Sequence, residues 1–214
     1  MKLHGYYRSS ASYRVRIALN LKNLDADTTS VHLSRNGGEQ FQAAFAGLNP
    51  QHLLPVLETD GAVLTQSLAI IEYLDETRPG MKLLPPDALG RARVRQLAMV
   101  SACDIHPLNN LRVLKYLTGA LGVSEEQKNS WYRHWTSLGL AALEAELAAS
   151  PHTGLYCHGD TPTLADCCLL PQIYNARRFN CDLSGYPTIL RIVAHCEALP
   201  AFQAAHPDVQ PDAE

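Results

Sequence analysis

Two consecutive prolines, Pro85 and Pro86, divide this chain of 214 residues into two stretches of different character. Before them, short alternating segments are interleaved with helical ones. After them, apolar residues recur at spacings of three and four. Because proline cannot continue a helix, the run Leu84-Pro85-Pro86-Asp87 predicts a domain boundary. We therefore expect a mixed α/β domain over residues 1–80 and an all-α domain over residues 88–214.

The first stretch predicts the element order β-α-β-α-β-β-α. We expect strands over residues 2–7, 28–33, 55–58 and 62–65, and helices over residues 12–22, 40–46 and 67–76. A strand-helix-strand start implies a parallel pair covered by its helix, and Asp60-Gly61 is a hairpin signal that adds antiparallel strands. Ser67 is expected to cap the last of these helices.

The second stretch predicts four helices. We expect them over residues 88–111, 124–149, 163–178 and 188–199, followed by an extended segment over residues 206–212. Thr163 and Asp166 have the spacing of a capping box, in which the two residues satisfy backbone N–H groups at a helix start. We interpret this motif as the start of a core helix and not as a ligand site.

Composition and charge exclude several classes of protein. The formal net charge of −3 favours neither a nucleic-acid-binding protein nor an acidic tail. No apolar run approaches the ~20 residues of a membrane span, and MKLHGYYRSS lacks the apolar core of a secretory signal. The six cysteines all follow residue 102, and none has metal-ligand spacing. We expect a cytosolic protein with reduced thiols and no metal site.

The segment Arg8-Ser9-Ser10-Ala11-Ser12 carries the first strand into the first helix. A helix start has unsatisfied N–H groups and a partial positive charge, so it suits an anion, to which serine hydroxyls can also donate. The alternative is that one serine only caps the helix, which for this segment alone is the more frequent case. Gln66-Ser67 allows the same two interpretations.

Leu54-Pro55 precedes the third predicted strand. Proline is tolerated at the first residue of a strand, and the bond before it is cis in about 5–6% of cases. A cis bond would turn the Leu54 backbone outward, where it could pair with an extended peptide ligand. Alone, this feature is weak.

These features occur together and in order, and the chain resembles the cytosolic glutathione transferases over nearly its whole length. The segment SSASYRVRIALNLK is similar to the zeta-class signature, which reads Ser-Ser-Cys-Ser followed two residues later by Arg-Val-Arg-Ile-Ala-Leu. That class includes maleylacetoacetate and maleylpyruvate isomerases, and four further segments are similar to it: GLNPQHLLPVL, QSLAIIEYLDE, DIHPLNNLRVLKYL and PTLADCCLLPQ. The resemblance implies a thioredoxin-like N-terminal domain, an all-helical C-terminal domain and a homodimer.

The resemblance also implies a glutathione cofactor and assigns its contacts. The serine role falls on Ser9, and further cofactor contacts are implied at Ser10, the Ala11 backbone, Gln40, the Leu54 main chain, Gln66, Ser67, His106 and Asn110. Ala11 departs from the signature, which has cysteine there. The thiol expected at this site is therefore that of glutathione.

The expected chemistry follows from the thiol. A free thiol has a pKa of about 8.5, which hydrogen bonds from Ser9 and the helix start would lower. The thiolate would add reversibly to a cis-enedione and allow rotation to the trans isomer. A dicarboxylate substrate needs cations, and the candidates are Arg8, Arg112 and Arg178, each with a surface or interdomain salt bridge as the alternative. Arg112 is expected on the same helical arc as His106 and Asn110.

Three functions remain open. The leading hypothesis is a maleylacetoacetate isomerase in aromatic amino-acid breakdown, with a maleylpyruvate isomerase or a general transferase of the same class as alternatives. A thiol–disulfide or dehydroascorbate reductase would need a cysteine at the first helix, and none precedes Cys103. A non-catalytic binding protein on the same fold is the third possibility.

Overall fold

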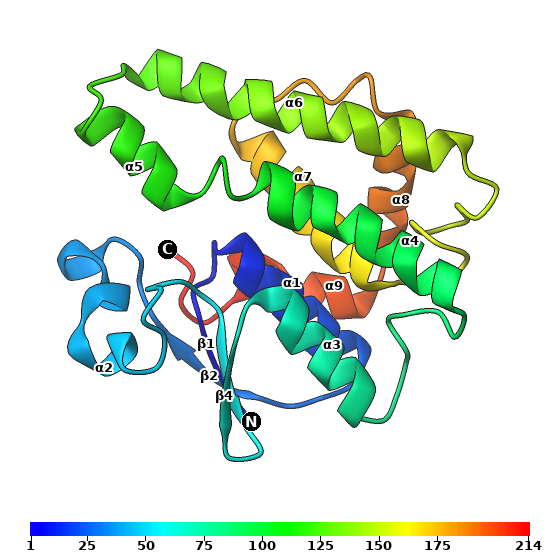
Figure 1. The fold of residues 1–214 in the computed structure, drawn as a ribbon, viewed down its shortest axis with the longest axis horizontal. Helices are drawn as coiled ribbons and strands as arrows, with labels where there is room; N and C mark the ends of the chain where they lie inside the picture. The colour runs from blue at the N-terminus through cyan, green and yellow to red at the C-terminus, as the bar shows by residue number, and fades with distance from the viewer. The chain divides into compact units, whose positions relative to one another are not determined.

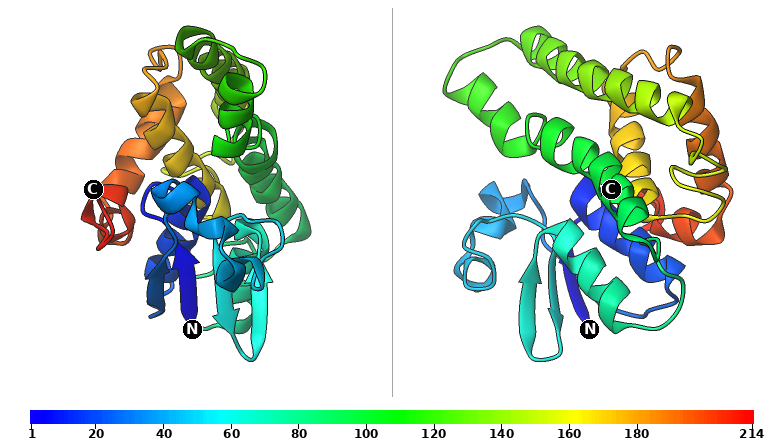
Figure 2. Two further views of the ribbon diagram at one scale, coloured as in Figure 1. Left: turned by 90° about the vertical axis from the view of Figure 1, so that its left-hand side faces the viewer. Right: turned by 45° about the vertical axis from the view of Figure 1, so that its right-hand side comes forward.

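The computed structural model describes residues 1–214, which form two compact units (Figures 1 and 2). The first unit comprises Met1–Leu83 together with Glu197–Glu214, and the second comprises Leu84–Cys196. Residues 197–214, which the sequence-based division places in the helical domain, pack against the first unit because α1 binds their backbone. The Asn20 side chain donates to the carbonyl of Ala201 at 2.9 Å. No helix has both the length and the apolar character needed to cross a membrane.

The first unit is built on one four-stranded sheet in the order β2-β1-β3-β4. The central strand β1 (Lys2–Gly5) runs parallel to β2 (Asp27–Ser30) and antiparallel to β3 (Val56–Thr59), and β3 pairs antiparallel with β4 (Ala62–Thr65). Asp60 and Gly61 connect the last two strands with φ values of 52° and 74°. Such positive values are those of a type I′ hairpin turn, as Asp-Gly predicts. The predicted mixed, thioredoxin-like sheet is confirmed.

The strand register brings one end of each of the four strands to the same edge of the sheet. Gly5 is paired with Ser30, and His4 with Val56, which is itself paired with Thr65. The chain therefore leaves β1, β2 and β4, and enters β3, at the same edge. Loops that are far apart in sequence meet there.

Helix α1 (Ser10–Leu21) is buried along nearly its whole length. It contacts α3 (Ser67–Thr77) and α9 (Pro200–Ala205), and Figure 1 shows α1 and α3 on one side of the sheet. The predicted helix over residues 40–46 is two short pieces, η2 (Glu39–Phe41) and α2 (Ala43–Ala46), which follow η1 (Arg35–Gly37). The predicted extended segment contains a 3-10 turn, η4 (Pro207–Val209).

The second unit consists of helices and connecting turns. Its helices are α4 (Ala88–Met99), the π-helical turn η3 (Val100–Ile105), α5 (Leu111–Gly119), α6 (Glu125–Ala149), α7 (Leu164–Arg178) and α8 (Pro187–Glu197). The prediction of a single helix over residues 88–111 is wrong. The helical path ends near Pro107, which has no N–H to donate, and α5 starts afresh with Asn110 as its cap.

The predicted capping box opens the buried helix α7. The backbone N–H and the hydroxyl of Thr163 both donate to Asp166 Oδ2 at 2.8 Å, and the N–H of Cys157 donates to Asp166 Oδ1 at 2.9 Å. Burial raises the pKa of the Asp166 carboxyl, and these hydrogen bonds oppose that rise. The motif is structural, as predicted, because every bond it makes fixes the start of α7.

Candidate functional site

Ser9 lies in the turn that joins β1 to α1. Its N–H donates to the carbonyl of Tyr6 at 3.0 Å, which closes a four-residue turn, and its Oγ accepts from the N–H of Ser12 at 3.2 Å. Ser9 is thus a helix cap, yet the cap uses a lone pair of the oxygen. The hydrogen of the hydroxyl stays available to donate. Capping and anion binding are therefore compatible at this residue.

The first turn of α1 offers a second donor beside that hydroxyl. The carbonyl of Ser9 accepts from the N–H of Tyr13 at 2.8 Å, so helical bonding starts there. The N–H of Ala11 precedes the first intrahelical bond and points along the helix axis, as the leading N–H groups of any helix do. Two donors at the positive end of a helix dipole suit a negatively charged ligand atom.

Gln40 and Leu54 are linked through the loop that precedes β3. His52 Nδ1 lies 3.0 Å from the carbonyl oxygen of Gln40, and the Asn49 side chain donates to the carbonyl of Leu53 at 2.7 Å. The Leu54-Pro55 peptide bond is cis. The Gln40 side chain is buried, its Nε2 donates to the Leu33 carbonyl at 3.4 Å, and its Oε1 has no hydrogen-bond partner in the protein.

Gln66 and Ser67 start α3, with their roles exchanged relative to the prediction. Gln66 occupies the cap position with φ 68° and ψ 113°, and its Nε2 donates to Gln51 Oε1 at 3.0 Å. Ser67 is the first helical residue and does not cap the helix, so that prediction is wrong. Its hydroxyl instead accepts from Arg14 Nη1 at 3.2 Å.

Arg14 is a residue that the sequence analysis missed. Its side chain is 2% exposed, and its bond to Ser67 joins the first turns of α1 and α3. A signal for it existed: Arg14 lies four residues after Ser10, on the helix face that also carries Ile17, Ala18 and Leu21. A charged side chain in that position must find a partner at the helix start.

Arg8 shares the turn with Ser9 and is exposed. Its Nη2 donates to the hydroxyl of Tyr6 at 3.0 Å, and its guanidinium carbon lies 5.0 Å from the ring centroid of Tyr7. Burial raises the pKa of Tyr6, and the Arg8 cation opposes that rise. The tyrosines thus hold the guanidinium group itself, which is exposed and can also meet an anion.

The predicted residues of the second unit fall into two places. His106 Nε2 lies 3.4 Å from Asn110 Nδ2, and Asn110 Oδ1 accepts from the backbone N–H of Arg112 at 3.1 Å. These residues do not share one helical arc, because His106 ends the π-helical turn η3 while Arg112 is in α5. Arg178 is on α7, where its Nη1 donates to Asn175 Oδ1 at 3.3 Å.

All six cysteines are free thiols. Burial raises the pKa of both Cys157 and Cys167, so these two stay protonated. All six belong to the second unit, and the buried Ala11 leaves the β1–α1 turn without a thiol. The turn therefore offers hydroxyl and amide donors but no thiol of its own.

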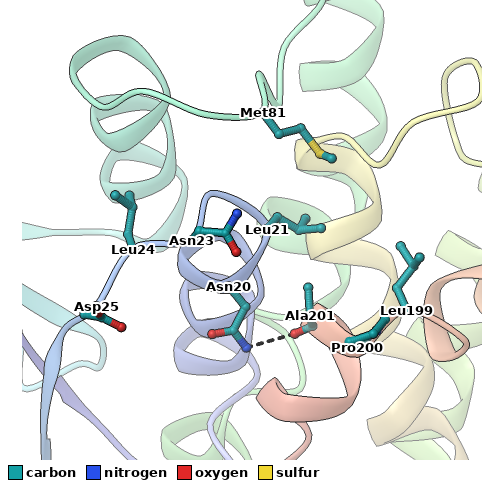
Figure 3. A pocket seen from close by; sticks show the side chains of 9 residues that line it. All are labelled: Asn20, Leu21, Asn23, Leu24, Asp25, Met81, Leu199, Pro200 and Ala201. Atoms are coloured by element: carbon teal, nitrogen blue, oxygen red, sulfur yellow. Dashed lines mark hydrogen bonds between the residues drawn. The ribbon is translucent and has the colours of Figure 1, made fainter.

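A hollow of about 690 Å³ opens at the other end of α1 (Figure 3). It is lined by Asn20, Leu21, Asn23, Leu24, Asp25, Met81, Leu199, Pro200 and Ala201. Asn20 is about 16 Å from Ser9 along the helix axis, at 1.5 Å per residue. None of the predicted site residues lines this hollow.

Comparison with known proteins gives a consistent result. The N-terminal domain model of the glutathione S-transferases matches residues 3–82, and the C-terminal domain model matches residues 139–206. A probable maleylacetoacetate isomerase of Vibrio cholerae is 56% identical over 99% of this chain and 97% of its own.

Two solved structures are similar over their whole length. A bacterial zeta-class maleylpyruvate isomerase in its holo form has a TM-score of 0.97 at 50% identity. A maleylacetoacetate isomerase from Methylobacterium extorquens with bound malonate and glutathione has a TM-score of 0.96 at 42% identity. Both comparisons cover 100% of each chain.

Proposed function

Since the chain belongs to the zeta-class glutathione transferases, the family that includes the maleylacetoacetate isomerases, we propose that it is a glutathione-dependent cis–trans isomerase converting maleylacetoacetate to fumarylacetoacetate. This reaction would be a step of aromatic amino-acid catabolism. Glutathione supplies the thiolate that adds reversibly to the cis double bond. The residues of this chain bind glutathione, favour its ionised sulfur and hold the substrate carboxylates.

One observation carries the proposal: Ser9 caps α1 through its oxygen while its hydrogen remains free to donate. A donor aimed at a sulfur anion favours the thiolate over the thiol and so lowers the pKa of the thiol. The N–H of Ala11 and the helix dipole act in the same direction. We assign the catalytic role to Ser9, with Ser10 and Ala11 as cofactor contacts.

The remaining polar groups at this sheet edge fit a peptide. We propose that Gln40, Gln66, Ser67 and the main chain of Leu54 bind the glutathione backbone. The buried Oε1 of Gln40 lacks a partner, which is costly unless a donor arrives on binding. His106 and Asn110 are proposed as further glutathione contacts, since family resemblance assigns them and their side chains lie 3.4 Å apart.

We assign the substrate carboxylates to Arg8, Arg112 and Arg178. Each is exposed, and a guanidinium binds carboxylates through two parallel hydrogen bonds. Arg8 is the best supported of the three candidates because it belongs to the same turn as Ser9. The malonate bound by the Methylobacterium relative supports a dicarboxylate. The homodimer and the cytosolic location are also proposals, which rest on the family resemblance and on six free thiols.

Substitutions at Ser9 test the proposal in an assay with maleylacetoacetate and glutathione. Ser9→Ala is expected to lower kcat by on the order of a hundredfold, with a smaller effect on glutathione affinity, because the lost bond acts on the thiolate. Ser9→Asp keeps a capping oxygen but has no hydroxyl hydrogen, so it should fold and be inactive. Ser9→Thr keeps both functions and should retain activity. Absence of any glutathione-dependent rate in the wild type would sink the proposal.

A maleylpyruvate isomerase is the second candidate. It is favoured by the holo maleylpyruvate isomerase structure, which is 50% identical to this chain. The chemistry is the same, with a shorter substrate. Comparison of kcat/KM for the two substrates on the same preparation decides between them.

A further inference from the structure

Residues 207–214 contact the turn that presents Ser9, although they are far from it in sequence. Asp212 Oδ2 accepts from the backbone N–H of Tyr7 at 3.1 Å and from the hydroxyl of Ser30 at 2.7 Å. Both residues belong to the same compact unit as Asp212. One carboxylate oxygen thus ties the β1–α1 turn to the end of β2.

The backbone of that turn is held from two directions. The carbonyl of Tyr7 accepts from Arg16 Nη2 at 3.0 Å, and the carbonyl of Tyr6 accepts from the N–H of Ser9 at 3.0 Å. Arg16 is itself fixed, because its Nε donates to the carbonyl of Ala205 at 3.1 Å. These bonds fix the carbonyl side of the turn. The N–H of Tyr7 is fixed by Asp212 alone.

A second carboxylate keeps this segment in place. Glu214 Oε1 accepts from Arg35 Nη2 at 2.5 Å, and its Oε2 lies 3.3 Å from His32 Nε2. His32 Nδ1 accepts from the backbone N–H of Arg35 at 2.8 Å, so Nε2 carries the hydrogen in the neutral ring and points it at Glu214. Asp212 is therefore held between η4 and an anchored residue.

We propose that Asp212 is a positioning residue for the reaction: by accepting from the N–H of Tyr7, it sets the direction in which the turn presents the Ser9 hydroxyl. The inference rests on the proposed function, because it assigns a purpose to the placement of Ser9. Asp212 touches neither glutathione nor substrate in this role. It acts through two hydrogen bonds: the Tyr7 N–H donates to the Asp212 carboxylate, and the Ser9 N–H donates to the Tyr6 carbonyl.

The test compares three variants of the full chain. Asp212→Ala removes the acceptor and is expected to lower kcat/KM by on the order of ten- to a hundredfold, since small misplacement of a catalytic group is that costly. Asp212→Asn keeps an amide oxygen that can accept both bonds and should restore activity to within about threefold. Asp208→Ala is the matched control, because it removes another carboxylate from the same segment, one whose Oδ2 lies 3.8 Å from His206 Nδ1.

Two further measurements separate positioning from stability. The ultraviolet absorbance of the thiolate, followed with pH on reduced glutathione bound to each variant, should show a higher thiol pKa in Asp212→Ala than in Asp212→Asn. Amide hydrogen exchange at Tyr7 should become faster in Asp212→Ala, while exchange at Val31, which donates to Gly5, stays unchanged. A merely structural loss would change urea midpoints and leave the thiol pKa where it is.

The outcomes are distinct. A folded Asp212→Ala variant with wild-type kcat/KM and thiol pKa overturns the inference. If that variant does not fold, Asp212→Glu takes its place, because it keeps the charge but displaces the acceptor, and wild-type behaviour there overturns the inference equally. If the wild type itself fails to isomerise, the proposed function falls, while the thiolate titration and the Tyr7 exchange still decide the role of Asp212.

Discussion

Deleting one partner of a buried ion pair is expected to destabilise the first unit strongly. Lys22, whose side chain is 0% exposed, ends α1 and lies 3.2 Å from Asp75 of α3. Its ammonium also donates to the carbonyl of Met81 at 2.9 Å, and Asp75 Oδ1 accepts in addition from the N–H of Leu83 at 2.8 Å. The pair thus joins α1 and α3 to the segment that leaves the unit.

Replacing Asp75 with alanine removes two interactions at once. Breaking a buried pair by deleting one partner costs about 3–5 kcal/mol, because the remaining charge stays buried. The N–H of Leu83 also loses its acceptor, a cost of about 1–3 kcal/mol. These terms share one carboxylate and are not additive, so we expect a loss of about 4–6 kcal/mol. That is comparable to the whole stability of a small domain, about 5–15 kcal/mol.

The assay is urea unfolding followed by far-ultraviolet circular dichroism. Glu76→Ala, at an exposed neighbouring position on α3, is the control and should change the unfolding free energy by less than about 0.5 kcal/mol. The double variant Lys22→Met/Asp75→Leu should recover much of the loss, because an apolar pair carries no buried charge. An Asp75→Ala variant within about 1 kcal/mol of the wild type would refute the reasoning.

Three further predictions follow from single contacts. Asp166→Ala should lower the thermal midpoint and yield little folded protein, because it frees three buried donors, of which two are on Thr163. The hydrogen bond from His4 lowers the pKa of Glu58 below its usual 4.5. The ionised Glu58 therefore stabilises the folded state above pH 4.5, and this stabilisation is lost as the pH falls through the lowered pKa. Unfolding free energies of Glu58→Gln and the wild type should therefore converge as the pH falls below 4.5 and through the lowered pKa. Ala11→Cys should leave the isomerisation rate within about threefold, measured with glutathione saturating, because the reacting thiol is not the protein's own.

Features that depend on neighbouring residues were predictable from the sequence. Asp60-Gly61 forms its hairpin turn, and Thr163 with Asp166 forms its capping box, because each is determined by side chains within a few positions. The parallel pair β1–β2 and the antiparallel pair β3–β4 also followed from local patterns, whereas the antiparallel pairing of β1 with β3 did not.

Features that depend on distant pairing were not predictable. Ser67 was expected to cap α3, but its hydroxyl bonds to Arg14, 53 positions away. The Asp212–Tyr7 bond spans 205 positions, and no sequence periodicity predicts it. The prediction that Arg112 shares a helical arc with His106 and Asn110 was wrong for a local reason. The π-helical turn η3 and the break after it change the helical phase before α5 begins.

Gln66, which we propose as a glutathione contact, has a strained backbone conformation at the start of α3. Its φ of 68° at ψ 113° is a conformation that residues with a Cβ avoid, at a cost on the order of 1–3 kcal/mol. Glycine would adopt it without that cost, so selection for stability alone favours a glycine there. The glutathione contact that we propose for Gln66 gives a reason for glutamine at this position, at the expense of stability. Directed evolution for a more heat-resistant variant should reach this residue early, and should lose glutathione affinity when it does.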